Sequence, residues 1–390
     1  MKLTSFISTL IIIFNLMLLT ACGDIKNIED LNYVTAIGID FRDGKYIGYV
    51  QMVGFPSEAG SAGEGGGEEV TMYVASGEGS TFNESLFQIY RTAQERIIWA
   101  HVTSIVITEE ALAEGFENIF DGITRYEEFR LTPWIFATKE PIEDIFTTSG
   151  FFNQALNTIL HNPTDIHEQS SILAPQKLFE FASNVYEPNY TVNIPTIKVN
   201  DTQWKKNKNR ELKLEYDGAF FMQGEELKAY FPIDTIKGYR WISPDSVRLG
   251  IPVSNPEDPY FLLVVKDPSI STDIIGTNEN IEFEFNLRAK GYIVVRDKNK
   301  VLNYEEMVKV SEEAIKKEIE DLYKLGLEEN IDFFNLEHTL YRKKPYVWKD
   351  LSKSGQKDNL KELKLTNINV TINIKHTSAS KNKQLRTKNK

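Results

Sequence analysis

The feature that most limits how this chain can fold is the position of its single cysteine, Cys22, directly after an apolar stretch. No other cysteine occurs among the 390 residues, so disulfides within the chain and cysteine nucleophiles in its body are excluded. Hydrophobic residues make up 41% and aromatic residues 12% of the chain, which is enough to form substantial cores. We therefore expect a globular protein whose fold depends on hydrophobic packing.

The first 21 residues have the pattern of a bacterial lipoprotein signal peptide. Lys2 precedes an almost wholly apolar run that ends in the letters LTAC at Cys22. Small residues precede the cleavage site of a secretory signal, and a lipoprotein signal adds a cysteine that receives diacylglycerol. We predict a signal peptide at 1–21, lipidation of Cys22 and a lipidated leash at 22–30. The alternative is an uncleaved membrane anchor, because the run approaches the lower length limit of roughly 17 residues.

The charge distribution separates the body of the chain from its end. The net charge of −12 argues against nucleic acid as a partner. Residues 378–390 carry five basic side chains and no acidic one, with almost nothing to bury, which predicts a disordered tail. The tail either attracts anionic lipid or serves only to keep the chain soluble.

Residues 31–200 have the pattern of a mixed α/β domain. Strands are expected at 33–41, 101–108 and 132–139, with a hairpin turn at Asp43-Gly44. Thr81 and Glu84 form a capping box ahead of apolar residues at helical spacing that continue to Ile97. A second helix is expected between residues 109 and 130. This alternation of strands and helices is typical of an α/β domain.

A polar, basic stretch at 201–212 is expected to be a linker to an α+β region at 213–377. The predicted elements there are a hairpin at Gly224, an alternating strand from Ile281, a long helix from Tyr304 to about Gly326, and a final strand at 365–376. A subdivision is expected near 280–290. The predicted fold class is therefore α+β: a mixed α/β N-terminal domain, then a mostly antiparallel C-terminal half with one long helix.

The chain has no sequence pattern that identifies an enzyme. The five histidines lack the spacing of a zinc site, and neither a nucleophile elbow nor a phosphate-binding Walker loop occurs. Carboxylates number 56, so a glycosidase-like pair is not excluded by sequence, but no pair stands out. We expect no catalytic residue, no metal and no cofactor.

Four blocks of sequence, in order along the chain, carry a family resemblance. They contain Cys22 with Ala36 to Asp40; His101 with Arg125, Glu128 and Arg130; Gly218 with Gly238 and Trp241; and Asp332 with Pro345 and Trp348. In their order and spacing these blocks resemble the Ger(x)C family, the lipoprotein C subunits of nutrient germinant receptors in endospore-forming bacteria. The chain departs from the family at Gly23, where a tryptophan usually follows the lipidated cysteine.

The resemblance implies a non-enzymatic, lipid-anchored subunit at the outer face of the inner spore membrane. Its implied partners are a multi-spanning A-type subunit and a transporter-like B-type subunit, and its implied role is scaffolding or signal transmission. Arg125, Glu128 and Arg130 are candidates for an internal ion-pair network or for an interface. Trp241 and Trp348 are candidate buried anchors, because tryptophan is highly buried on average.

Two other functions remain open from the sequence. A substrate-binding lipoprotein of a membrane transporter would have two parallel α/β lobes with a cleft between them. A cell-wall hydrolase would depend on one pair of carboxylates.

Overall fold

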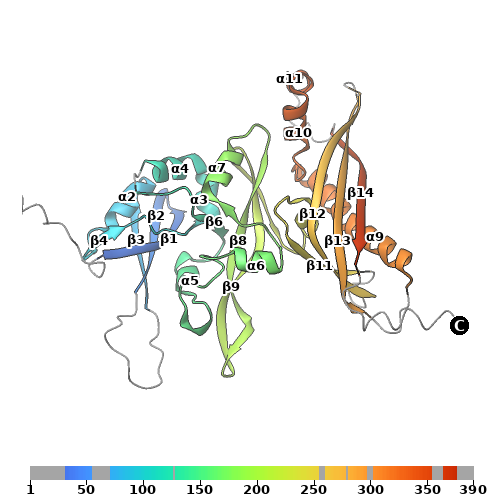
Figure 1. Cartoon of the computed structure of the whole chain (residues 1–390). Helices are drawn as coiled ribbons and strands as arrows, with labels where there is room; N and C mark the ends of the chain where they lie inside the picture. The colour runs from blue at the N-terminus through green and yellow to red at the C-terminus, as the bar shows by residue number, and fades with distance from the viewer. Residues whose placement is uncertain are drawn as a thin grey trace, which may run out of the picture.

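The structure, a computed structural model, describes residues 31–54, 71–125, 128–253, 260–277, 280–296, 302–353 and 363–375. The predicted signal peptide at 1–21, the leash at 22–30 with Cys22, and the basic tail at 378–390 lie outside the described residues. The described part of the chain contains two β-sheets that lie side by side (Figure 1). The N-terminal half builds most of the first sheet, and the C-terminal half builds the second.

The first sheet is mixed, with a parallel centre and antiparallel edges. Its strands in the described residues are β1 (Leu31–Arg42), β2 (Lys45–Val53), β3 (Met72–Gly79), β4 (Arg96–Ile98), β5 (Ser104–Thr108), β6 (Trp134–Thr138), β7 (Gln176–Lys177), β8 (Thr191–Lys206), β9 (Asn209–Gln223) and β10 (Glu226–Pro232). The spatial order is β10–β9–β8–β6–β5–β1–β2–β3, with β4 beside β1 and β7 beside β6. Parallel pairing joins β1, β5, β6 and β8, whereas β2–β3 and β9–β10 are antiparallel additions on either side.

Helices cover both faces of the first sheet, because the side chains of its central strands alternate between two cores. Ile37 and Ile39 of β1 face one core, and Ala36 faces the other. The first core is covered by α2 (Phe82–Ile89), α3 (Glu109–Glu114), α4 (Phe116–Thr124) and α7 (Leu178–Val185). The second is covered by α5 (Ile142–Thr147). Two short helices, η3 (Phe151–Asn153) and α6 (Thr164–Gln169), follow α5.

The second sheet has the order β11 (Arg248–Val253), β12 (Phe261–Gly276), β13 (Ile281–Arg296) and β14 (Lys364–Ile374). The first three strands pair antiparallel, but β14 runs parallel to β13. Between β13 and β14 the chain forms α9 (Tyr304–Glu329), α10 (Leu336–Lys343) and α11 (Pro345–Lys353), which supply the long crossover that a parallel pair needs. The long helix that the sequence predicts is present as α9, and its buried stripe contains Ile315, Ile319 and Leu322.

The predicted fold class is confirmed, since an α/β N-terminal half precedes a mainly antiparallel half with one long helix. The pairing of β11, β12 and β13 does not match the two parallel α/β lobes expected of a transporter-associated binding protein.

The linker predicted at 201–212 is wrong. These residues form the outer part of the long β8–β9 hairpin, which turns at Asn207 and Lys208, both at positive φ. Most of these residues are exposed at the end of the hairpin, which explains why they are polar. Exposed hairpin ends and linkers are both rich in polar residues, so composition alone does not distinguish them.

The change from one sheet to the other occurs further along the chain, between β10 and β11, where the short helix α8 (Tyr239–Ile242) lies. The subdivision expected near 280–290 is also wrong, because β13 continues through it as one strand.

The hairpin of β9 and β10 belongs to both halves of the molecule. On β9, Phe220 and Met222 pack into the first core, while Ala219 and Phe221 pack into the core of the second sheet. Phe231 of β10 joins that second core as well. The two halves therefore share a hairpin with one apolar face in each core.

Candidate functional site

Trp241 is a buried anchor between α8 and α9. Its side chain is fully buried, and its Nε1–H donates a hydrogen bond of 2.6 Å to Glu318 Oε2. Arg240 donates to both carboxylate oxygens of Glu318, at 3.1 and 2.9 Å. Position 238 needs glycine, because a Cβ there would collide with the main-chain carbonyl of Glu318. The Gly-x-x-Trp element found in the sequence therefore docks α8 onto α9.

Trp348 on α11 is half-buried. Its Nε1–H donates to Glu337 Oε1 at 3.3 Å, and its ring meets the ring of Tyr341 edge to face at 5.0 Å. Both partners lie on α10, so Trp348 holds α11 against α10.

The three charged residues singled out in the sequence lie at and after the end of α4, and all three are exposed. Arg125 donates to Asp121 at 2.7 Å, one helical turn back. Glu128 pairs with Arg96 at 3.5 Å, and Arg130 faces solvent. Arg125 and Glu128 thus pair with different neighbours, and a role of these residues at an interface stays a prediction.

A set of hydrogen bonds joins the first sheet to the segment after α9. The backbone N–H of Thr191 donates to Asn335 Oδ1 at 2.6 Å, and Asn335 Nδ2 donates back to the carbonyl of Thr191 at 3.3 Å. His338 Nδ1 lies 3.0 Å from the carbonyl oxygen of Pro188, and its ring meets Tyr190 edge to face at 5.0 Å. Two segments about 150 residues apart are thereby fixed to one another.

A second group of contacts lies between α6 and the start of β11. Ser171 donates its backbone N–H to the carbonyl of Arg248 at 2.8 Å, and its hydroxyl oxygen accepts from Val247 N at 2.9 Å. His167 Nε2 lies 2.8 Å from the carbonyl oxygen of Asp245. We call these two groups together the inter-sheet joint: residues 167–171 and 188–191 on one side, and 245–248 and 335–338 on the other.

Asp332 shapes the turn that presents Asn335 to the inter-sheet joint. Its Oδ2 accepts from the backbone N–H of Glu337 at 2.8 Å, and its carbonyl accepts from Asn335 N at 3.1 Å. The side chain is buried, and loss of hydration raises the pKa of the carboxyl to about 6 from its ordinary value of 3.8. Asn335 itself sits at positive φ (52°), which asparagine tolerates better than most residues.

Beside the joint lies a cavity of about 470 Å³, which we call the inter-sheet cavity. The least exposed polar side chain among its described lining residues is Asn193 on β8, which is 3% exposed. Asn193 Oδ1 accepts hydrogen bonds from Gln176 Nε2 at 2.8 Å and from the Tyr239 hydroxyl at 2.9 Å. Burial raises the pKa of Tyr239, which keeps its hydroxyl a donor. The arrangement is a preformed polar cradle within a partly aromatic cavity.

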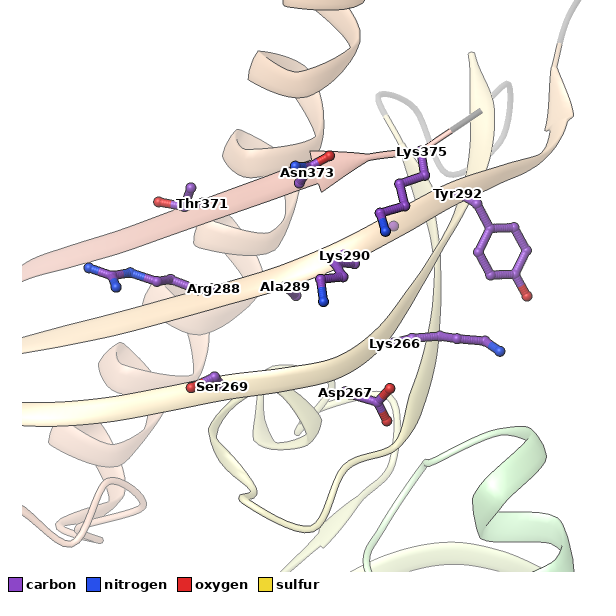
Figure 2. A pocket seen from close by; sticks show the side chains of 11 residues that line it. Lys266, Asp267, Ser269, Arg288, Ala289, Lys290, Tyr292, Thr371, Asn373 and Lys375 are labelled. Atoms are coloured by element: carbon purple, nitrogen blue, oxygen red, sulfur yellow. The ribbon is translucent and has the colours of Figure 1, made fainter. Parts of the chain in front are cut away.

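A second hollow, of about 530 Å³, lies on a face of the second sheet (Figure 2). Four cationic side chains line it, Lys266 from β12, Arg288 and Lys290 from β13, and Lys375 just after β14, together with Asp267. Figure 2 shows Lys290 on β13 and Lys375 just past the end of the adjacent strand β14. Such a group of exposed cations can attract an anion, chiefly as point charges.

Neither hollow was predicted from the sequence. The interior of β8 contains a usable signal, because Asn193 interrupts the apolar run TVNIPTI, and a buried polar residue there must find partners. Gln176 and Tyr239 carry no such signal, since their meeting with Asn193 depends on how the two sheets pack.

Within the described residues, no group of three or more His, Cys, Asp or Glu side chains is arranged to hold a metal ion. Within the same residues, no helix combines the length and apolar composition needed to cross a membrane.

Two family descriptions match the chain in succession. Residues 24–199 match the spore germination protein N-terminal domain, and residues 217–378 match the family described as spore germination B3/GerAC like, C-terminal. Together these matches cover both halves of the molecule.

Individual proteins of Bacillus subtilis (strain 168) are similar over most of their length. Spore germination protein KC is 23% identical over 408 residues, covering 95% of this chain and 96% of that protein. Spore germination protein B3 is 21% identical, covering 74% of each. The crystal structure of the GerBC protein superposes with a TM-score of 0.51 at 15% identity, covering 89% of this chain and 99% of that chain, which shows a shared fold.

Proposed function

Because the chain belongs to the Ger(x)C family of spore germination proteins, we propose that it is a lipid-anchored, non-catalytic subunit of a nutrient germinant receptor. The main support for the proposal is that the similarity to spore germination proteins extends over nearly the whole chain. The two family matches follow one another from residue 24 to residue 378, and protein KC is similar over 95% of the chain.

The anchor in this proposal is Cys22, with diacylglycerol on its thiol after removal of residues 1–21. Two acyl chains hold a protein on a membrane stably, since each buried methylene contributes about 0.8 kcal/mol. We place the protein at the outer face of the inner spore membrane, with A-type and B-type membrane subunits as its partners. The similar proteins named KC and B3 support a role beside other germination proteins.

A scaffolding role agrees with what the described residues from the family blocks do. Trp241 docks α8 onto α9, Trp348 holds α11 on α10, and Asp332 shapes the turn at the inter-sheet joint. Each of these side chains stabilises the arrangement of elements, which suits a protein that presents surfaces to partners.

The proposal is tested by giving single nutrients, one at a time, to spores that lack the gene and measuring the release of dipicolinate. We expect loss of the response to one nutrient class, with restoration by the wild-type gene. A trigger that acts without receptors serves as the control for spore quality. An unchanged response to every nutrient, in spores that also lack related receptors, would contradict the proposal.

The Cys22→Ala variant tests the anchor separately. We expect it to leave the membrane fraction and to restore germination poorly, although its ectodomain is unchanged. Full retention in the membrane fraction would contradict the lipid anchor while leaving the receptor role intact.

A further inference from the structure

We propose that the inter-sheet cavity is a binding site for a small uncharged molecule that carries hydroxyl groups. This inference rests on the cavity's own residues and does not depend on the proposed receptor function.

The first argument is the hydrogen-bonding state of the cradle. Asn193 Oδ1 already accepts from Gln176 and Tyr239, so the Asn193 Nδ2 donor and the Gln176 Oε1 acceptor are left over. Both atoms are buried and have no hydrogen-bond partner among the described residues. A buried polar group without a partner costs about 1–3 kcal/mol. A hydroxyl group accepts one hydrogen bond and donates another, so ligand hydroxyls can pair with both kinds of atom left over here, the Nδ2 donor and the Oε1 acceptor.

The second argument is the charge of the cavity. Asn193 and Gln176 at its floor are amides, and the described residues of its lining include no lysine, arginine or histidine. The lining includes two carboxylates, Glu180 and Asp245, and both residues are exposed. These carboxylates repel anions, and the unpaired amide atoms of Asn193 and Gln176 match a hydroxyl group, which needs no counter-charge. Uncharged polar molecules therefore fit the cavity best.

The third argument is the apolar part of the lining. Phe285, Phe333 and Phe334 are buried and contribute to the wall from the second half of the chain. Phe179 of α7, which is 48% exposed, lines the cavity from the first half. Aromatic side chains beside fixed polar groups are typical of small-molecule sites, and the volume falls within their usual range of about 300–1,000 Å³.

The walls come from both halves of the molecule. A bound ligand would therefore contact α7 and β8 on one side and the segment 333–335 on the other, next to the Thr191–Asn335 hydrogen bonds. Because such a ligand binds the assembled state only, we expect the unfolding temperature to rise as the ligand concentration exceeds its Kd.

The test uses the full-length protein in detergent, with glycerol, sorbitol and arabinose as uncharged probes, ethanolamine as a cation and glutarate as an anion. Ligand-observed NMR measures binding, and thermal unfolding measures stabilisation. We expect saturable binding and a raised unfolding temperature for at least one uncharged probe, and none for glutarate. No saturable binding by any uncharged probe at millimolar concentration, or tighter binding of ethanolamine or glutarate, would overturn the proposal.

Two variants locate the binding. Gln176→Met removes the unpaired acceptor Oε1 at a half-buried position. We expect this variant to bind the uncharged probe about tenfold more weakly, or weaker still. Gln203→Met, at an exposed position on β8, is the matched control and is expected to bind as the wild type does. Asn193→Ala should abolish binding. Because Asn193 is buried, thermal unfolding must first show that this variant folds. Equal affinity of Gln176→Met and wild type would overturn the proposal.

Discussion

At the scale of single residues, Asp332 shows how burial sets the charge state of a carboxyl. Its pKa rises to about 6 because the side chain loses hydration, and the hydrogen bonds from backbone N–H groups only partly oppose this. The folded state therefore binds the proton more tightly than the unfolded chain. The resulting stabilisation is complete below about pH 3.8 and is lost as pH rises through about 6.

The Asp332→Asn variant has no carboxyl to ionise, so it does not lose stability as pH rises through about 6. Its side-chain amide keeps an oxygen that can accept the hydrogen bond from Glu337 N. Relative to wild type, we expect the variant to gain on the order of 2–3 kcal/mol in unfolding free energy between pH 4 and pH 7. Urea unfolding at four pH values across this range measures the difference. Asp43→Asn, at the exposed β1–β2 turn, is the control and should show no such trend. A constant difference between Asp332→Asn and wild type would contradict the assigned pKa.

At the scale of elements, the docking of α8 on α9 depends on one indole hydrogen bond and one close approach. Trp241→Phe keeps most of the buried ring but removes the Nε1–H donor to Glu318. Because that bond involves a carboxylate, we expect a loss of about 2–3 kcal/mol in unfolding free energy. Trp204→Phe, with a ring 46% exposed near the end of β8, should change it by less than about 0.5 kcal/mol. Chemical denaturation of both variants gives the comparison, and equal losses would contradict the anchoring role.

Elements could be predicted from sequence where local signals were strong. The Asp43-Gly44 turn, the Thr81 cap and the long helix from Tyr304 are all present in the structure. The helix beginning at Phe82 is shorter than predicted, because it ends at Ile89 and Ile97 belongs to β4. Apolar residues at Ala93 and Ile97 continue the helical spacing by chance, since Ile97 is buried as part of a strand.

The helix predicted between residues 109 and 130 is divided by Gly115 into α3 and α4. Gly115 has a φ of 126°, a conformation that glycine adopts without strain. An isolated glycine within a helical pattern indicates such a break only weakly, because helices also tolerate glycine at a cost of about 1 kcal/mol.

At the scale of the whole molecule, two buried groups on different parts of the fold change the folding stability in opposite directions as pH changes. His161 is buried beside Thr103, and burial lowers the pKa of its imidazole to about 4 from 6.5. The Thr103 hydroxyl lies 2.6 Å from His161 Nδ1 and 2.9 Å from the carbonyl oxygen of Thr35. The stabilisation by His161 is complete above pH 6.5 and is lost as pH falls through about 4.

The contributions of Asp332 and His161 to stability therefore have opposite slopes between about pH 4 and 6. We expect His161→Gln to expose the Asp332 contribution, so that this variant loses stability as pH rises from 4 to 6. Wild type should show a flatter profile over the same range, measured by thermal unfolding at constant ionic strength. His101→Gln is the control, since His101 is exposed. If the unfolding temperatures of His161→Gln and wild type changed with pH in parallel, the opposite contributions of His161 and Asp332 would be contradicted.

The arrangement of the two sheets was the part least accessible from sequence. The shared β9–β10 hairpin places alternate residues, Phe220 and Phe221, in different cores, and both simply appear apolar in the sequence. The inter-sheet cavity could not be predicted for the same reason, since Gln176, Asn193 and Tyr239 meet only after both halves have packed. Local patterns predict elements, whereas contacts between distant segments decide which elements meet.

The parallel pairing of β13 with β14 also sets an order of events during synthesis. All strands of the first sheet precede α9 in the chain, so that sheet can form while the rest is still being made. The second sheet gains its last strand only after α9, α10 and α11 have been synthesised, and such long-range pairing forms slowly. Until then, Leu365, Ile368 and Ile372 are missing from the core beneath α9. The C-terminal half is therefore the part of the newly made chain that is exposed to aggregation for the longest time.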